Sequence, residues 1–386
     1  MSAKLVRTVL ASAAALVGVA SQAATINLID LGGVAGSPAQ QGFEIAAQYW
    51  GNILTNTATI NLGVSFAPLG SGIIGQAGSA QMDFTVAAWQ SAFLSTRSNS
   101  IIDRTLVLPA LGAQGGISGL TAGVNGSGHN DNNVTAVLNG TQVASKMLWL
   151  NTAVVKAVGG TASYGAGSGR DGDITFSSNF AFDFNPSDGI SAGQFDFIGV
   201  AIHEIGHVLG FVSGVDYFDL VGGPNGPYKN LYPDLNNDSI LSSLDMYRYS
   251  APSTLDFRTG GTKYFSIDGG ATALFGNTFS TGQFNGDGRQ ASHWKDSPGC
   301  TVGNGLLDPT FCLGQMGVVT GLDLAAYDAM GWNLRADALT YAGMSTAQIY
   351  ASAVPEPSAW ALMLLGGIGV VGAVSRRRRA AAGAQT

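Results

Sequence analysis

The stretch His203-Glu204-Ile205-Gly206-His207 contains the residues of this sequence that are best suited to chemistry. On a helix, side chains four positions apart project from the same face, so the two imidazoles can bind one Zn²⁺ at about 2.1 Å each. Glu204 lies beside them and can accept a proton from a water that the metal activates. Because the chain has so few His and Glu residues, a chance occurrence of this spacing is rare. The stretch therefore predicts a zinc site with Glu204 as the catalytic residue.

A third ligand is required, because zinc sites that catalyse hydrolysis usually take three protein ligands and keep one position for water. Ser213, which follows the motif closely, is a poor zinc ligand, and the one Glu downstream of the motif is Glu356, near the C-terminus. The ligands that remain open are His293, Asp216 and Asp219.

Segments just before the motif are predicted to position it. Ser191-Ala192-Gly193-Gln194 has the S-x-x-Q pattern of a capping box, which predicts a helix from about Gly193 to Leu209 with Gly210 as its stop. Asp173–Phe184 alternates apolar and polar residues, which predicts a strand, or a hairpin that bends at residues 177–179.

Apolar periodicity predicts further elements along the chain. Strands are predicted at Thr25–Leu31 and Thr59–Ala67, and helices at Gln41–Leu54, Asp83–Leu94 and Met147–Val158. Residues 112–133 are rich in Gly and Asn and predict a long surface loop, in which His129 is solvated. The pattern at residues 320–323 can cap a last helix, which is predicted to stop near Gly331.

The motif and its continuation resemble the metzincin zinc peptidases. His207-Val208-Leu209-Gly210 completes their pattern H-E-x-x-H-x-x-G, in which the Gly lets the chain turn back beneath the metal. The place of the usual third ligand is taken by Ser213. His293, which follows a long insertion and precedes Trp294, instead resembles the third His of the leishmanolysin-like members.

This resemblance spans residues 195–333 and includes the position of the family's Met-turn. Gly305-Leu306-Leu307-Asp308-Pro309 stands at that position, so Leu307 replaces the Met expected beneath the zinc, with Met316 as the fallback. A Leu can fill the same apolar floor, so we expect activity to be retained with altered packing.

The resemblance implies a metzincin-like α+β fold and a zinc endopeptidase that acts on a protein or peptide substrate. Residues 24–210 would form an N-terminal catalytic subdomain with a mixed sheet, ending in the zinc helix, and residues 211–343 a loop-rich C-terminal subdomain. The substrate would lie extended along an edge strand, a role we expect for Asp173–Phe184. Leu307 favours an alternative, in which the chain is a catalytically silent surface or matrix protein associated with extracellular polysaccharide.

Both ends of the chain carry export signals. Residues 1–23 have a basic start, an apolar run and a small-x-small site, which predicts a secretory signal. Residues 354–379 carry Val-Pro-Glu-Pro-Ser, a short apolar run and four Arg, an order that resembles the PEP-CTERM sorting tail. That resemblance implies an inner-membrane segment and cleavage by an exosortase-type enzyme, with the product at the cell surface or outside the cell; a plain membrane anchor is the alternative. Residues 344–353 are predicted to be a linker.

Composition and cysteine content bear on the partners of the chain and on disulfide formation. The net charge is −7, and without the six basic and one acidic residues of the two terminal signals it becomes −12, which disfavours nucleic acid as a partner. Cys300 and Cys312, in an oxidising compartment, predict a disulfide. Asp234–Asp245 spaces its oxygens like a calcium loop but lacks the Gly at the sixth position. A Ca²⁺ site, in a calcium-dependent binding module, is therefore one interpretation of this segment, and an ordinary turn is the other.

Overall fold

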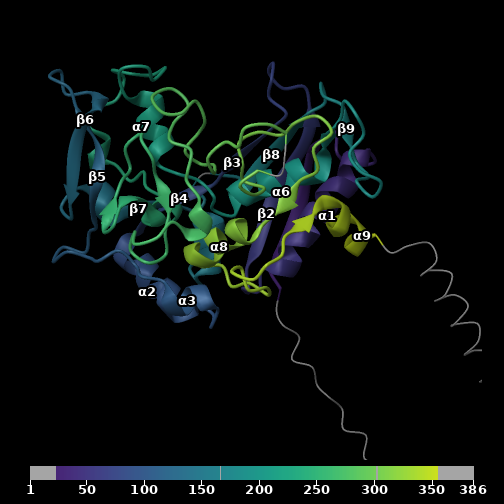
Figure 1. The fold of residues 1–386 in the computed structure, drawn as a ribbon, viewed down its shortest axis with the longest axis horizontal. Helices are drawn as coiled ribbons and strands as arrows, with labels where there is room; N and C mark the ends of the chain where they lie inside the picture. Colours follow the sequence, from purple (N-terminus) through teal and green to yellow (C-terminus); the bar gives the residue numbers. More distant parts are fainter. Residues whose placement is uncertain (1–22, 166, 301–302, 355–386) are drawn as a thin grey trace, which may run out of the picture.

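A mixed four-stranded sheet forms the part of the molecule that carries the motif helix (Figure 1). Its strands, in spatial order, are β1 (Thr25–Gly32), β2 (Thr59–Ala67), β8 (Gly172–Ser177) and β3 (Gly75–Ser79). The first three run parallel and β3 runs antiparallel to β8. The computed structural model describes residues 23–165, 167–300 and 303–354. The fold of these residues is α+β, as predicted.

Two helices, α1 (Pro38–Ile53) and α6 (Phe197–Val208), pack against this sheet and against each other. Their contact is aromatic: the Phe43 ring lies 5.0 Å from that of Phe176 in β8 and 5.1 Å from that of Phe197 in α6. Trp50 of α1 donates its indole hydrogen to the Ile202 carbonyl at 3.0 Å. The burial of these clustered aromatic rings therefore holds α6 against the sheet.

The other half of the molecule combines segments from both sides of the motif. It contains the paired strands β4 (Gln81–Thr85) and β7 (Met147–Asn151), and the hairpin β5 (Ser118–Val124) and β6 (Asn130–Asn139). Single bridges join these strands to the chain after the motif, at Leu148 with Leu241, Leu120 with Asp256, and Asp131 with Gly223. Residues before and after the predicted boundary at Gly210 thus lie together in this half (Figure 1).

The remaining elements of the described residues are short. The helices are α2 (Val86–Thr96), α3 (Ile101–Thr105), α4 (Val143–Lys146), α5 (Thr152–Ala157), α7 (Val215–Val221), α8 (Gly321–Met330) and α9 (Thr346–Ala353). The strands are β9 (Phe182–Asp183), β10 (Phe195–Asp196), β11 (Arg248–Ala251), β12 (Thr254–Leu255), β13 (Tyr264–Phe265), β14 (Val318–Val319) and β15 (Met344–Ser345). The 3₁₀ turns are η1 (Leu235–Asn237), η2 (Leu244–Tyr247) and η3 (Leu274–Gly276).

Several element predictions are confirmed, and they are those with the strongest local signals. β1, α1 and β2 lie where the apolar periodicity places them. The side chain of Thr320 caps α8 through a capping box with Asp323, and the helix ends at Gly331, whose φ is 119°. A left-handed residue at this position is the usual C-terminal stop of a helix, and Gly adopts it without strain.

Three predictions fail where a strand and a helix adjoin or where a hairpin was taken for a loop. Asp83–Leu94 begins as β4 before it becomes α2, and Met147–Val158 begins as β7 before it becomes α5. The two strands pair with each other across the fold, and this non-local pairing overrides the helical periodicity. Residues 112–133 contain most of the β5–β6 hairpin rather than a long loop, with His129 partly buried at its turn.

Two further predictions need correction. Asp173–Phe184 is neither a hairpin nor an edge strand, because β8 lies between β2 and β3 while β9 pairs with β10. Residues 344–353 are not a linker: β15 pairs with β14, and α9 packs against α1. The predicted secretory signal and most of the sorting tail, with its apolar run, lie outside the described residues. Within the described ranges no helix is long and apolar enough to cross a membrane.

Candidate metal centre

The motif lies on α6, whose start differs from the prediction. Phe195 and Asp196 pair with β9, so the chain stays extended up to Asp196, which caps the helix by accepting a hydrogen bond from the Gly199 amide at 2.9 Å. The predicted capping box at residues 191–194 therefore does not form the helix end. The predicted stop is confirmed, since Gly210 has a φ of 125° and a Cβ there would collide with Val154.

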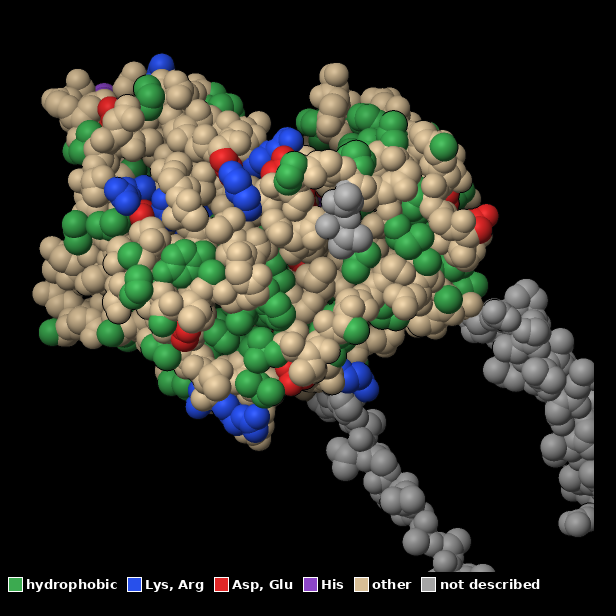
Figure 2. Space-filling view, viewed as in Figure 1, with side chains coloured by type: hydrophobic (Ala, Val, Ile, Leu, Met, Phe, Trp, Pro, Cys, Tyr) green, Lys and Arg blue, Asp and Glu red, His purple; other side chains and the backbone are tan. Residues whose placement is uncertain are grey.

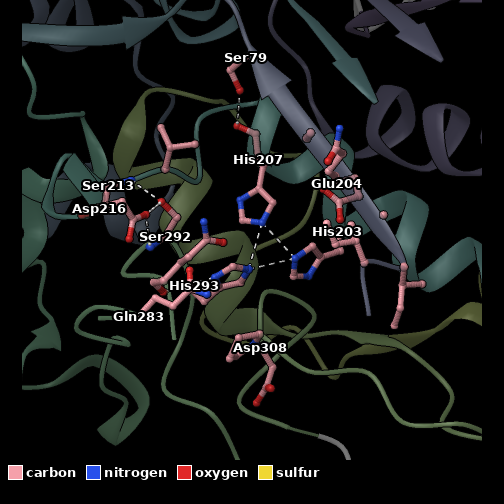
Figure 3. A pocket seen from close by; sticks show the side chains of 18 of the residues that line it. Ser79, His203, Glu204, His207, Ser213, Asp216, Gln283, Ser292, His293 and Asp308 are labelled. Carbon is pink, nitrogen blue, oxygen red and sulfur yellow. Dashed lines mark hydrogen bonds between the residues drawn. The ribbon is translucent and has the colours of Figure 1, made fainter. Parts of the chain in front are cut away.

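His203 and His207 of α6 meet His293, which arrives from a loop after β13 (Figure 3). The Nε2 atom of His207 lies 3.0 Å from that of His203 and 3.2 Å from that of His293. The third pair, His203 and His293, is 3.3 Å apart between the same atoms. The structure thus brings three of the predicted ligands to one point, although 86 positions separate His207 from His293.

The hydrogen bonds of the three Nδ1 atoms determine whether each Nε2 atom carries a hydrogen or a free lone pair. The Nδ1 atoms of His203, His207 and His293 face the carbonyl oxygens of Leu306, Phe211 and Gln290 at 2.8, 2.7 and 3.3 Å. A carbonyl only accepts, so each Nδ1 carries the hydrogen and each neutral ring keeps a lone pair on Nε2. Three lone pairs directed at one point are the donor set of a metal ion.

The spacing and the ionisation of the rings fit the same interpretation. A tetrahedral Zn²⁺ at about 2.1 Å from each nitrogen holds its ligand atoms about 3.4 Å apart, close to the observed separations. Burial, and then the nearby His207, lowers the pKa of His203 to about 3. Burial also lowers the pKa of His207, and that of His293 well below its ordinary value. The rings are therefore neutral at neutral pH, as metal ligands must be.

Glu204 lies beside the histidines on the same helix and lines the same cleft. Its side chain is 8 % exposed, and burial raises its pKa to about 8. A Cβ on Gly75 of β3 would lie 3.2 Å from the Glu204 Oε1 atom, so the absence of a side chain there leaves room for the carboxylate. A cation nearby would favour the ionised form and so counteract the effect of burial.

The cleft has a volume of about 610 Å³ and is open to solvent between the two halves of the molecule (Figure 2). β3 forms one wall, the three histidines and Glu204 form the floor, and the far wall includes Tyr217, Pro309 and Phe311. Within the described sheet β3 pairs with β8 alone, so its other edge is free on the cleft side. β3, rather than Asp173–Phe184, is therefore the edge strand next to the candidate centre.

The turn at Leu306-Leu307 lies directly against the motif helix. The Leu306 carbonyl orients His203, and Leu307 is fully buried, with its Cδ1 atom 3.4 Å from where a Cβ on Gly206 would lie. Asp323 of α8 accepts hydrogen bonds from the amides of Leu306 and Leu307 at 2.8 and 3.2 Å. Leu307 thus packs against the helix that carries His203 and His207, and its role as an apolar floor beneath the metal stays a prediction.

The sequence missed the role of Asp323. Besides the Leu306-Leu307 turn, it accepts a hydrogen bond from the Trp294 indole at 2.9 Å, so it supports the residue next to His293 as well. Its place in the Thr320 capping box was a visible signal, but that signal explains only one of its oxygens. A fully buried carboxylate with so many donors around it was not foreseeable from spacing alone.

The alternative ligands, Asp216 and Asp219, have their oxygens directed elsewhere. Asp216 accepts hydrogen bonds from Ala291 and Ser292, and Asp219 from the amides of Phe284 and Asn285 at 2.9 and 2.6 Å. Within the described residues, the one group of three or more His, Cys, Asp or Glu side chains close enough to hold a metal is the histidine cluster.

In the predicted calcium loop, carboxylate oxygens likewise accept hydrogen bonds from other groups of the protein. Asp234 accepts a hydrogen bond from the Asn236 amide at 3.0 Å, as in an ordinary turn. Asp245 is fully buried and bonds to Ser213 and Gly214 instead. The binding of Ca²⁺ at this loop stays a prediction. The predicted disulfide between Cys300 and Cys312 is present, with a Cα–Cα distance of 5.5 Å.

Comparison with known proteins identifies the C-terminal tail. Residues 353–379 match the family model of the PEP-CTERM protein-sorting motif, which confirms the predicted sorting tail. The motif indicates an exported protein that is sorted at the cell envelope and recognised by an exosortase-type enzyme. No curated protein and no solved structure gave a significant match to the chain.

Proposed function

We propose that the chain is an exported zinc endopeptidase of the metzincin kind, in which His203, His207 and His293 hold Zn²⁺. The observation that carries this proposal is the convergence of three Nε2 lone pairs at 3.0–3.3 Å on the floor of an open cleft, beside a buried carboxylate. Zinc bound there would lower the pKa of a water and polarise a peptide carbonyl.

Glu204 is the general base of the proposed reaction. Its carboxylate, ionised beside a cation, accepts the proton of the attacking water and returns it to the leaving amine. Three features support this role: it neighbours His203, it lines the cleft with all three histidines, and it lies in buried surroundings, with a side chain 8 % exposed. In such surroundings a charge acts more strongly on its neighbours than it does in bulk water.

The substrate is proposed to lie extended along the free edge of β3. An unpaired strand edge offers main-chain hydrogen-bond donors and acceptors that an extended peptide can use, whatever its side chains. Gly75, Gln76, Ala77 and Ser79 of this strand line the cleft. Because Gly75, Ala77 and Ser79 are small, a peptide backbone can approach the strand closely at these positions. A peptide held this way passes in front of the histidines and Glu204.

Replacing Glu204 by Gln tests the mechanism while keeping the shape of the side chain. We expect the variant to retain zinc and to lose at least about 100-fold in the cleavage of unfolded casein, because general bases contribute that much or more. Metal content is measured by atomic absorption on the same samples. Cleavage at the wild-type rate by this variant would contradict the proposed role of Glu204.

A chelator experiment on the unmodified protein tests the class of function. The proposal requires cleavage of casein that a zinc chelator abolishes and added Zn²⁺ restores. A protein that binds zinc tightly but leaves every unfolded substrate intact would contradict the peptidase and favour the silent surface protein. His293→Ala should lose most of the bound zinc, and full zinc content in that variant would exclude His293 as the third ligand.

A further inference from the structure

His293 is the histidine of the cluster that no helix or strand holds. His203 and His207 are fixed by α6, whereas His293 lies in a bend between a turn at residues 291–292 and an isolated bridge at Trp294. Its Nε2 atom nevertheless lies within 3.3 Å of both helix-borne rings. Some other set of contacts must therefore fix this part of the backbone.

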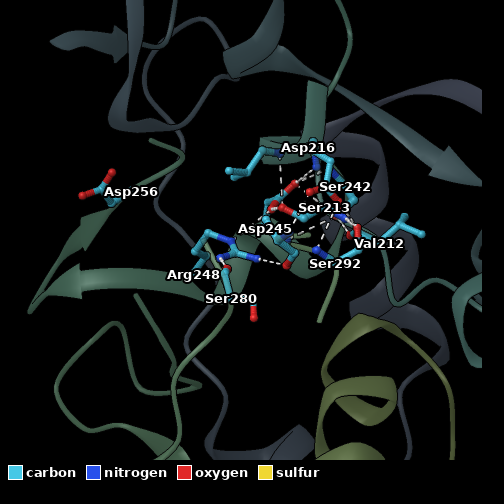
Figure 4. A network of polar contacts seen from close by, with 12 residues as sticks. Val212, Ser213, Asp216, Ser242, Asp245, Arg248, Asp256, Ser280 and Ser292 are labelled. Atoms are coloured by element: carbon cyan, nitrogen blue, oxygen red, sulfur yellow. Dashed lines mark hydrogen bonds and ion pairs between the residues drawn. The ribbon is translucent and has the colours of Figure 1, made fainter. Parts of the chain in front are cut away.

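Besides the Ser280 amide, which donates to the His293 carbonyl at 3.0 Å, Asp216 on α7 supplies contacts of this kind (Figure 4). Its Oδ1 atom accepts a hydrogen bond from the Ala291 amide at 2.6 Å, and its Oδ2 atom accepts from the Ser292 amide at 3.1 Å and from the Ser292 hydroxyl at 2.5 Å. The Ser292 hydroxyl oxygen in turn accepts from the Ser213 amide at 2.8 Å. One carboxylate thus connects the two residues before His293 to the segment that follows α6.

Asp245 and Arg248 hold the same two segments from the other side. Asp245 accepts hydrogen bonds from the Ser213 hydroxyl at 2.5 Å and the Gly214 amide at 2.8 Å, and its Oδ1 atom lies 3.4 Å from the Arg248 Nε atom. Arg248 donates to the Ala291 carbonyl at 2.6 Å, and its guanidinium lies 4.1 Å from the centre of the Phe279 ring. Both side chains are fully buried.

We propose that Asp216, supported by Asp245 and Arg248, is a positioning residue that fixes His293 for metal binding. The inference rests on the proposed function, because it takes the three histidines as the metal ligands. Asp216 acts through the backbone of residues 291–292, whose amides donate to it, and it is not among the described side chains close enough together to hold a metal. Residues of this kind, which orient a ligand from behind, typically change metal affinity by 10- to 100-fold.

The same helix provides a matched control. Asp219 lies three residues further along α7, is buried, and also accepts hydrogen bonds from two backbone amides, those of Phe284 and Asn285. The loop that it holds carries no proposed ligand. Asp219→Ala should therefore disturb folding in the same manner as Asp216→Ala and leave the metal centre intact.

The experiment measures zinc affinity by competition with a chelator, on the purified full-length chain and its variants. We expect Asp216→Ala to bind Zn²⁺ about 10- to 100-fold more weakly than the wild type, and Asp219→Ala to bind within about two-fold of it. The visible spectrum of bound Co²⁺, which reports ligand geometry, should change in the first variant only. Asp216→Asn, which keeps one acceptor oxygen, should recover part of the affinity.

Four outcomes would overturn the inference. Wild-type affinity in Asp216→Ala would show that the turn holds His293 without it, and an equal loss in Asp219→Ala would show that general destabilisation is the cause. Zinc binding that disappears in Asp216→Ala but survives in His293→Ala would make Asp216 itself a ligand. A wild-type chain that retains no zinc would remove the proposed function as well, whereas the first two results leave that function in place.

Discussion

The two ring nitrogens of His203 have different partners, one in the cleft and one in the buried core. The ring therefore links the cleft to the core. Its Nδ1 atom donates to the Leu306 carbonyl, whose turn is held in place by the Asp323 carboxylate, while its Nε2 atom faces the other two imidazoles. Burial raises the pKa of Asp323, and the surrounding amide donors oppose that shift. The orientation of one imidazole therefore depends on a carboxylate in α8, more than a hundred residues further along the chain.

Leu307 allows a direct test of packing beneath the histidines. Leu307→Met conserves volume, so we expect a change of less than about 1.5 kcal/mol in the free energy of unfolding and unchanged zinc affinity. Leu307→Ala leaves a cavity and should cost about 2–5 kcal/mol. Urea unfolding measures both. A Met variant as unstable as the Ala variant would contradict the view that this position is an apolar floor that either side chain can fill.

At the scale of residues, the sequence predicted the groups that meet in the cleft and not the groups that hold them there. His203, Glu204 and His207 follow from helical spacing, and His293 from its resemblance to a known family. The positioning roles of Arg248, Asp245 and Asp323 gave no such signal, because the partners that define these roles lie far away in the sequence and hydrogen bonds to the backbone impose no residue pattern. Asp216 was noticed as a potential ligand, and the structure gives it contacts to the turn before His293.

The motif helix is packed so closely at one point that only Gly fits. A Cβ at Gly206 would collide with the Tyr327 hydroxyl and touch Leu307. Gly206→Ala should therefore lower the free energy of unfolding by about 1–3 kcal/mol, as overpacked sites do. Gly78→Ala is the control, since its Cβ would meet no atom within 4 Å. Thermal unfolding of both variants measures the difference, and equal melting temperatures would contradict the close contact between α6 and α8.

The buried Asp328 on α8 makes the packing of α8 on α3 dependent on pH. Burial, and then the charge of Asp103 on α3, raises the pKa of Asp328 from 3.8 to about 8. Between these values the unfolded chain releases a proton that the folded chain keeps. The free energy of unfolding therefore falls as pH rises through this window, by at most about 1.4 kcal/mol per pH unit.

Asp328→Asn removes this titration. The variant should consequently gain stability relative to the wild type as the pH is raised from 5 to 8. Below pH 4 the titration of the Asp328 carboxyl should contribute little to the difference in their free energies of unfolding. Urea unfolding at several pH values measures the difference between them. A difference that stays constant over the whole range would show that Asp328 does not titrate as its buried position requires.

Element predictions succeeded where one pattern continued over a whole element. β2 and α1 have long runs of a single periodicity, and their apolar faces are buried as that periodicity requires. They failed at β4–α2 and β7–α5, where five residues of strand pass directly into a helix. The pairing of Asp83 with Trp149, and of their neighbours, decides these strands. Such a pairing is not encoded in either segment alone.

At the scale of the whole molecule, the folded body extends further along the chain than the sequence pattern indicated. Thr346 of α9 donates its hydroxyl hydrogen to the Asp196 carboxylate at 2.5 Å, and Asp196 caps the motif helix. Ile349 of the same helix is 1 % exposed. The predicted linker is therefore part of the folded body and supports the start of α6. The S-x-x-Q pattern of residues 345–348, which forms a capping box, was a local signal of this helix that the prediction missed.

Two truncations test this conclusion. A chain that ends at Val354 keeps α9 and should unfold at the same urea concentration as the full-length protein. A chain that ends at Gly343 loses the contact to Asp196 and the burial of Ile349, and should be less stable by at least about 2 kcal/mol. If both truncated chains unfold together with the full-length protein, α9 does not belong to the stable body.

The 86 positions between His207 and His293 also determine when the centre can form. Before the intervening chain has folded, the third imidazole is absent and two helix-borne rings remain, a pair that grips a cation weakly. If the chain is a peptidase as proposed, a polypeptide emerging from the export machinery would thus be inactive toward itself and its neighbours until it is nearly folded. Under the proposed function, this order of folding would delay peptidase activity without the need for an inhibitor or a removable segment.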